Sequence, residues 1–240
     1  YTVTVTDVNG CIDASSVIFT NPDSVQVSAA ITSDYNGASI QCYGSSTGTA
    51  ECTAAGGLTP YNYLWTNGNT TASISGMPAG TYTVTIADAN GCSDLTSVTF
   101  SDSDSLEITA GITSSYNGQD ILCSGSSTGS AAVNPAGGLS PYSYLWSNGN
   151  TTDNISGVNA GVYVVTVTDI NGCQGVSEIA FTNPDTVNIL TIEVTSDFNG
   201  QQVNCKGSST GSIGLAIEGG TNAYTYLWSN GGTTDELTGI

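Results

Sequence analysis

The sequence predicts an all-β protein made of tandem immunoglobulin-like antiparallel β-sandwich repeats of about 81 residues, arranged end to end. One observation behind this prediction is an aromatic stretch that occurs three times, at residues 61–68, 142–149 and 224–231, with its tryptophans 81 and 82 residues apart. A second is a series of short alternating segments separated by turn signals about every 8–12 residues. No helical period accompanies these segments, which argues against a helical or mixed fold.

The aromatic stretch predicts the central core strand of each repeat. In its first copy Tyr61, Tyr63 and Trp65 alternate along the chain, so their side chains share one face of a strand. The Asn67-Gly68 pair that follows favours a turn. An aromatic face can also be a ligand platform, but large aromatic side chains more often supply the buried area of a small core. The residues predicted to be core are Trp65, Trp146, Trp228, Tyr82 and Tyr163.

The shared register of the cysteines and tryptophans divides the chain into four parts. Residues 1–21 are expected to be the C-terminal part of a preceding repeat. Two complete repeats follow, 22–102 and 103–183, and residues 184–240 are expected to be the N-terminal part of a further repeat. The chain therefore reads as a segment of a longer array.

Each repeat is expected to contain about seven short strands. In the first complete repeat, a strand over residues 25–32 turns at Asn36-Gly37, and the chain returns through Ile40. The later strands are expected at 50–54, 61–65, near 74, at 81–88 and from 92 to 100. In the third copy, one extra residue between Pro184 and Asn199 predicts a β-bulge in the first strand.

The charge of the chain excludes two classes of partner. There are 20 acidic residues, one basic residue and no histidine, which gives a net charge of −19 at pH 7. Such a surface repels nucleic acid and anionic membranes. No apolar run reaches the roughly 18 residues that a membrane-spanning helix needs, so no membrane insertion is expected within this chain.

Catalytic residues are not expected, and the chain is predicted not to be an enzyme. Without histidine, no histidine-based triad or proton shuttle can form. The acidic side chains are scattered, and the three that recur, Asp7, Asp88 and Asp169, lie beside Asn-Gly turns. Aspartate in such a place usually accepts hydrogen bonds from its own backbone. No cofactor-binding or metal-binding residue is assigned.

Structural Ca²⁺ is the one cofactor that the charge pattern suggests, because Ca²⁺ takes carboxylate and carbonyl oxygens as ligands. The candidate ligands lie at the expected joins between repeats and are Asp23, Asp102, Asp104 and Asp185. No dense Asp-x-Asp-x-Asp run occurs, so solvated surface charge is the default interpretation.

The cysteines predict an oxidising, extracellular setting, since six of the seven lie in register. The preferred disulfides join Cys42 to Cys92 and Cys123 to Cys173. Both bonds lie within one repeat, so each repeat could fold alone. The alternative is a bond between Cys92 and Cys123, which would join neighbouring repeats.

The remaining cysteines have separate expectations. Cys11 and Cys205 would pair with cysteines outside this chain. Cys52 stands where the other copies have Val133 and Leu215, which predicts a small buried side chain with a free thiol.

Two motifs give the repeat a family resemblance. They read PYxYxWxNG over residues 60–68 and GxYxVTxxDxNGC over residues 80–92. Together they resemble the SprB repeat, which builds giant cell-surface adhesins of gliding Bacteroidetes. For the SprB adhesin itself, the resemblance implies type IX secretion, an outer-membrane location and movement along the cell. For this chain it implies a place on the bacterial cell surface.

A short motif at the joins is similar to the Asp-Ser/Thr-apolar acceptor of Bacteroidetes protein O-glycosylation. Its candidate acceptor hydroxyls are those of Ser24, Ser105 and Thr186. The alternative explanation is a turn that leads into a strand. A glycan at these places would shield the joins from proteases.

The leading functional hypothesis is structural. The repeats would form the stalk of a large secreted filament protein that mediates surface attachment, with gliding as a further role. The alternatives are polysaccharide-binding repeat modules, or a spacer in a large secreted enzyme. Exposure of Tyr61 and Tyr63 would separate the first two. The expected partners are an extracellular surface or polysaccharide, contacted by parts outside this chain, and further copies in lateral or filament self-association.

Overall fold

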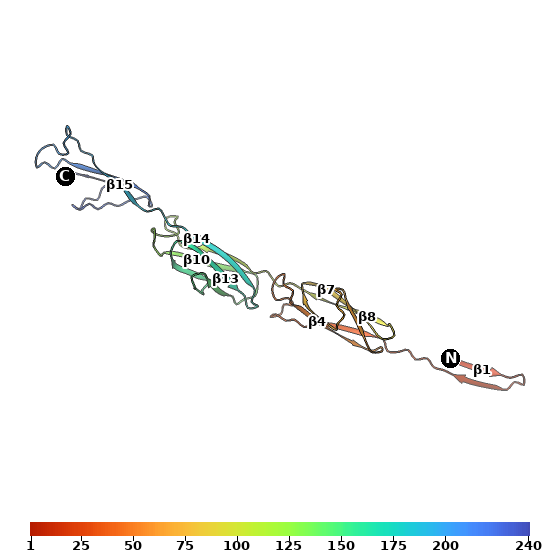
Figure 1. The fold of residues 1–240 in the computed structure, drawn as a ribbon. Coiled ribbons are helices and arrows are strands. Elements are labelled where there is room, and N and C mark those ends of the chain that lie inside the picture. The colour runs from red at the N-terminus through yellow and green to blue at the C-terminus, as the bar shows by residue number, and fades with distance from the viewer. The chain divides into compact units, whose positions relative to one another are not determined.

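The computed structural model describes residues 1–240 and consists of strands, turns and loops (Figure 1). Its 17 strands form six small sheets in which every paired strand is antiparallel. The predicted all-β class is confirmed. The chain divides into two compact units, Tyr1–Ser105 and Leu106–Ile240. No helix in either unit is long and apolar enough to cross a membrane.

The first complete repeat is a sandwich of two three-stranded sheets. Its strands are β3 (Gln26–Ile31), β4 (Gly48–Ala55), β5 (Asn62–Trp65), β6 (Ser73–Met77), β7 (Gly80–Ala87) and β8 (Ser93–Phe100). The sheet orders are β3-β4-β6 and β5-β7-β8. This is the immunoglobulin-like arrangement in which strands A, B and E face strands C, F and G.

The second complete repeat has the same topology. Its strands are β9 (Glu107–Ile112), β10 (Gly129–Ala136), β11 (Ser143–Trp146), β12 (Asn154–Val158), β13 (Gly161–Thr168) and β14 (Gln174–Phe181). The sheet orders are β12-β10-β9 and β11-β13-β14, and β13 and β14 run side by side in Figure 1. The registers correspond as well, because Trp65 pairs with Val84 and Trp146 with Val165.

A tryptophan lies at the centre of each sandwich core. Trp65 and Trp146 are each 1% exposed, and each indole N–H donates to a backbone oxygen, of Thr71 and Thr152, at 2.9 Å. Burial of the ring therefore leaves no unpaired donor. The first core is completed by Val25, Ile40, Ala50, Cys52, Ile74, Val84, Ile86, Val98 and Phe100, and the second by the corresponding residues.

The tyrosines predicted to be core lie at the margin of these clusters. Tyr82 and Tyr163 are partly buried and meet Phe100 and Phe181 edge to face, with ring centroids 5.7 Å apart in both pairs. Their hydroxyls donate to the backbone oxygens of Pro78 and Asn159. Each ring is therefore apolar on the inside and hydrogen-bonded at the rim.

The return through Ile40 is a loop, so each complete repeat has six strands and not about seven. Ile40 is fully buried, yet its segment contains only the isolated bridge between Tyr35 and Ala38. The backbone N–H of Gln41 donates to the Thr47 hydroxyl at 2.8 Å. Local side-chain acceptors of this kind compete with a strand ladder. The loop therefore contributes a core side chain without adding a strand.

The two outer parts of the chain are incomplete sandwiches. Residues at the N-terminal end form a hairpin of β1 (Thr2–Thr6) and β2 (Ile12–Ser16). At the C-terminal end, β15 (Asn188–Val194), β16 (Ser212–Glu218) and β17 (Glu236–Thr238) form one sheet. The register of β15 shifts between Ile189 and Thr191, which confirms the predicted bulge.

Trp228 corrects one core prediction, because it is only partly buried. Its indole N–H still donates to the Thr234 oxygen at 2.8 Å. What differs is the covering hairpin: β17 is the last strand of this chain, and no equivalent of β7 and β8 follows it. The local loop therefore forms, but the second sheet that would bury the ring is missing.

We expect Trp65→Ala to lower the unfolding free energy of its repeat by about 3–5 kcal/mol, because it removes a fully buried aromatic side chain. Chemical unfolding followed by circular dichroism would measure this loss. Trp228→Ala is the matched control and should cost much less. In the unmodified chain, acrylamide should quench the fluorescence of one tryptophan readily and of two poorly. Equal quenching of all three would contradict the core assignment.

Candidate functional sites at the two ends of the sandwich

Asp88 organises the end of the sandwich at which the chain enters, called here the leading end. Its side chain is 3% exposed. One carboxylate oxygen accepts from the backbone N–H groups of Asn90 at 2.9 Å and Cys92 at 2.8 Å, which fixes the turn between β7 and β8. The other accepts from Leu58 N at 3.0 Å. One side chain thus ties the hairpin turn to the loop before the tryptophan strand.

These hydrogen bonds control the electrostatics of the carboxylate. The pKa of Asp88 is lowered, chiefly by the Leu58 N–H, and burial opposes this effect. Asp169 accepts the equivalent bonds from Leu139, Asn171 and Cys173 at 2.9–3.1 Å. Sequence reasoning anticipated the bonds within the turn but missed the long-range bond to the loop.

The Gly56-Gly57 pair was the available signal for that missed bond. Gly57 has a φ of 63°, and a Cβ built at this position would lie 2.7 Å from an Asp88 carboxylate oxygen. Only glycine combines this left-handed backbone with so close an approach. The Gly57 N–H also donates to the Asp23 oxygen at 3.2 Å, so the same loop holds the incoming chain.

The opposite, trailing end of the sandwich binds the outgoing chain. The Ser39 hydroxyl donates to the Ser101 oxygen at 3.1 Å and accepts from Ser101 N at 3.0 Å. The Asp102 carboxylate accepts from Gly44 N at 3.0 Å. In the second repeat Thr182 bonds to Asp120, and Gly125 N donates to the Asn183 side chain at 3.2 Å. Both complete repeats therefore fasten the chain as it leaves.

The cysteines of one repeat lie at opposite ends of the sandwich, which corrects the predicted pairing. Cys42 belongs to the trailing-end loop, whereas Cys92 ends the leading-end turn, before the eight residues of β8. A strand of that length spans about 25 Å, far beyond the distance that a disulfide bridges. The structure has Cys42 and Cys173 disulfide-bonded and leaves Cys92 and Cys123 as free thiols. The proposed bonds within single repeats are not formed.

Cys52 is a buried free thiol on β4, as its place in the repeat predicted. Burial raises the pKa of this thiol. It therefore behaves as a small apolar side chain in the core.

The remaining candidate residues at the joins lie on the surface. Ser24, Ser105 and Thr186 are all exposed, so their hydroxyls are accessible. The acidic residues Asp23, Asp102, Asp104 and Asp185 are exposed too. No group of three or more acidic or cysteine side chains is arranged to hold a metal ion.

Three stretches of the chain match the SprB repeat model, at residues 38–70, 115–151 and 198–233. Each runs from the first Asn-Gly turn, through the trailing-end loop, to just beyond the tryptophan. The chain carries SprB repeats. The resemblance drawn from the sequence motifs is confirmed, and the matched part of each SprB repeat contains the buried or partly buried tryptophan.

Comparison with curated proteins finds no match. Among solved structures, the chain is similar to the N-terminal eight Ig domains of Down Syndrome Cell Adhesion Molecule, at 13% identity and a TM-score of 0.28. That match covers 96% of this chain and 40% of the other. The central Fibronectin-III array of RIM-binding protein matches at 12% identity and a TM-score of 0.22, over 81% of this chain and 78% of the other. The assignment of the SprB repeat fold rests on its sheet order and register, because these TM-scores are low.

The aromatic face of the SprB repeat points into the protein. Tyr61 and Tyr63 are partly buried and pack against the core, and the Tyr61 hydroxyl donates to the Gly56 oxygen. Tyr142 and Tyr144 repeat this packing, and burial raises the pKa of Tyr144. These rings serve the sandwich and its leading-end loop.

We expect Asp88→Asn to lower the melting temperature at neutral pH, because an amide cannot accept all the N–H groups that surround the carboxylate. The folded-state pKa of Asp88 is lowered, so its stabilisation is complete above the unfolded value, near 4, and is lost as pH falls through the lower folded value. The difference between variant and parent should therefore shrink in acid.

Asp34→Asn is the matched control for this prediction. Asp34 accepts one N–H, from Gly37 at 2.7 Å, which an asparagine oxygen can also accept. Differential scanning calorimetry across pH would compare the two variants. Equal melting shifts for both would contradict the role assigned to Asp88.

Peptide mapping of the chain without reductant should find Cys42 and Cys173 in disulfide-linked peptides. In the monomeric fraction, Cys92 and Cys123 should react with an alkylating reagent in the folded state, whereas Cys52 should react only after unfolding. A peptide that links Cys42 to Cys92 would restore the bond within a single repeat and contradict the placement of the two cysteines.

Proposed function

We propose that this chain is a stalk segment of a large secreted bacterial cell-surface adhesin. SprB repeats are consistent with a cell-surface adhesin-type repeat region and are typical of surface-exposed proteins. The stalk would hold an adhesive part of the protein away from the cell. Attachment to an extracellular surface or polysaccharide, and any gliding movement, would depend on parts outside this chain.

The observation that supports this function best is the fastening of the chain at opposite ends of each sandwich. The incoming chain is held where Gly57 binds Asp23, and the outgoing chain where Ser39 binds Ser101. A pulling force on the chain would therefore act along the strands. Strands loaded in this direction must break many ladder hydrogen bonds together before the repeat opens.

The packing of the aromatic residues favours the stalk over a polysaccharide-binding module. A carbohydrate platform needs exposed rings, but Tyr61 and Tyr63 pack against the core. We propose that the segment has no catalytic role, which agrees with its lack of histidine. Ca²⁺ at the joins would be an addition to the stalk and is not needed by the contacts that fasten it.

Small-angle X-ray scattering on tandem chains of one, two and four repeats would test the stalk. Joins of a few residues that contain proline leave little slack, so each repeat should add roughly 35–45 Å. The radius of gyration should then rise almost linearly with repeat number. A rise with the square root of repeat number would describe a flexible tether and contradict a stalk.

A further inference from the structure

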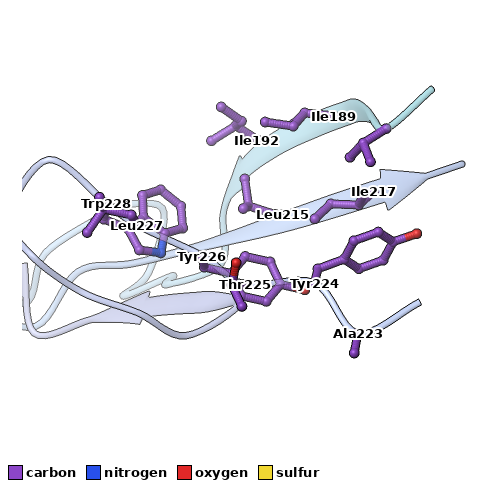
Figure 2. A pocket seen from close by; sticks show the side chains of 11 residues that line it. Ile189, Ile192, Leu215, Ile217, Ala223, Tyr224, Thr225, Tyr226, Leu227 and Trp228 are labelled. Atoms are coloured by element: carbon purple, nitrogen blue, oxygen red, sulfur yellow. The ribbon is translucent and has the colours of Figure 1, made fainter. Parts of the chain in front are cut away.

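An open apolar groove runs along the incomplete third repeat (Figure 2). Its volume is about 540 Å³. Ile189 and Ile192 of β15 and Leu215 and Ile217 of β16 line one side, with Tyr226 and Trp228 on the other. The groove is therefore the exposed inner face of half a sandwich.

In the complete repeats a hairpin fills the equivalent space. Val84 and Ile86 of β7, with Val98 and Phe100 of β8, are at most 7% exposed and belong to the same core as Trp65. β13 and β14 do the same for Trp146. The third repeat lacks only this element, because no strand follows β17.

The chain carries a hairpin of the same kind at residues 1–19, and its inner face is uncovered. Val3, Val5, Val17 and Phe19 stand at the positions of the four residues that fill the core of the first repeat, yet they are 53–75% exposed. Tyr1 meets Phe19 edge to face at 5.6 Å, as Tyr82 meets Phe100 at 5.7 Å. The hairpin is thus already shaped for a groove that it does not occupy.

The backbone of the third repeat also has a place for this hairpin. In the complete repeats the tryptophan strand pairs with the hairpin, Tyr63 with Ile86 and Trp65 with Val84. The corresponding segment, residues 225–228, forms no strand. Pairing Tyr226 with Val5 and Trp228 with Val3 would reproduce the register and satisfy the open backbone by strand addition.

We propose that the hairpin of one copy of this chain occupies the groove of a second copy, so that the two together complete one sandwich and copies associate head to tail. The contact is heterologous, and it leaves a hairpin free at one end of the assembly and a groove free at the other. Growth is therefore open-ended. This association is a property of the chain beyond its role in a stalk and would survive the failure of that role.

The leading-end contacts fit the same arrangement. In the complete repeats, Leu58 N and Leu139 N donate to Asp88 and Asp169. Thr221 stands at this position in the third repeat, and Asp7 is the equivalent aspartate of the hairpin, where it binds only its own turn. Insertion would bring the free oxygen of Asp7 to Thr221 N and restore the missing bond.

Insertion would also place two free thiols together. Cys123 lines a cavity of about 480 Å³ with Gly220 and Thr221, at the leading end of the third repeat. The inserted turn would occupy this end, and Cys11 is its last residue, exposed and unbonded. Oxidised glutathione can convert the two thiols into one disulfide, in which case it is itself reduced to two molecules of glutathione.

Non-covalent assembly is tested with two complementary variants under reducing conditions. Val5→Asp spoils the hairpin, and Leu215→Asp spoils the groove. By light scattering after size exclusion, the parent chain should form species above its 24.3 kDa mass, and each variant alone should be monomeric. A mixture of the two variants retains one good hairpin and one good groove, so it should form dimers and nothing larger.

The matched controls place the same charge on the opposite faces of the two strands. Thr4→Asp and Ala216→Asp should assemble like the parent. Because the net charge is −19, raising the salt concentration should strengthen assembly. A parent chain that stays monomeric at all concentrations and salt levels, or a mixture that forms no dimer, would overturn the proposal.

The covalent arm uses oxidised glutathione and a gel without reductant. The parent should give a ladder of multiples of 24.3 kDa that collapses with dithiothreitol. Cys11→Ser or Cys123→Ser should remove the ladder but leave non-covalent assembly intact, and Cys205→Ser should retain both. A ladder that persists in Cys11→Ser, or a Cys11–Cys123 bond within one copy, would contradict insertion into a second copy.

Discussion

The burial of one tryptophan between two three-stranded sheets is the contact on which each repeat depends. The third repeat separates its local part from its long-range part. There the indole N–H of Trp228 makes the same bond to the loop that follows, at 2.8 Å, as it does in the complete copies. The ring is nonetheless only partly buried, because the hairpin is absent. Local sequence therefore forms the loop, while full burial needs a hairpin distant in the sequence.

The recurrent aspartate connects the same two levels of structure. In the N-terminal hairpin Asp7 binds the N–H groups of Asn9 and Cys11 at 2.8 Å, and this lowers its pKa with the Cys11 N–H as the main cause. In the complete repeat Asp88 adds the bond to Leu58, which becomes the main cause of its lowered pKa. The turn is thus formed before the sandwich closes, and the remaining carboxylate oxygen is available to hold the closed state.

Period-two alternation was enough to predict the strands and the burial of Trp65 and Trp146, since both depend on nearby residues. The bulge at Leu190 was predictable too, because an extra residue in a paired strand must leave the ladder. The loop around Ile40 was not, because its buried side chain gives the same pattern as a short strand. The bond from Asp88 to Leu58 and the separation of Cys42 from Cys92 depend on tertiary placement, which the spacing of residues along the chain does not contain.

The polarity of the cysteines changes what a disulfide can do in this array. A trailing-end cysteine such as Cys42 cannot reach the leading-end cysteine of its own sandwich, so a bond that uses both kinds must join different repeats. Such a bond adds little to the folding of either repeat alone. It instead shortens the covalent path between the ends of the array, because every residue between the two bonded cysteines is removed from the path that carries a pulling force. Unfolding of a sandwich within that loop then cannot lengthen the chain. In an extended protein under tension, covalent bonds between repeats therefore limit extension more effectively than bonds within them.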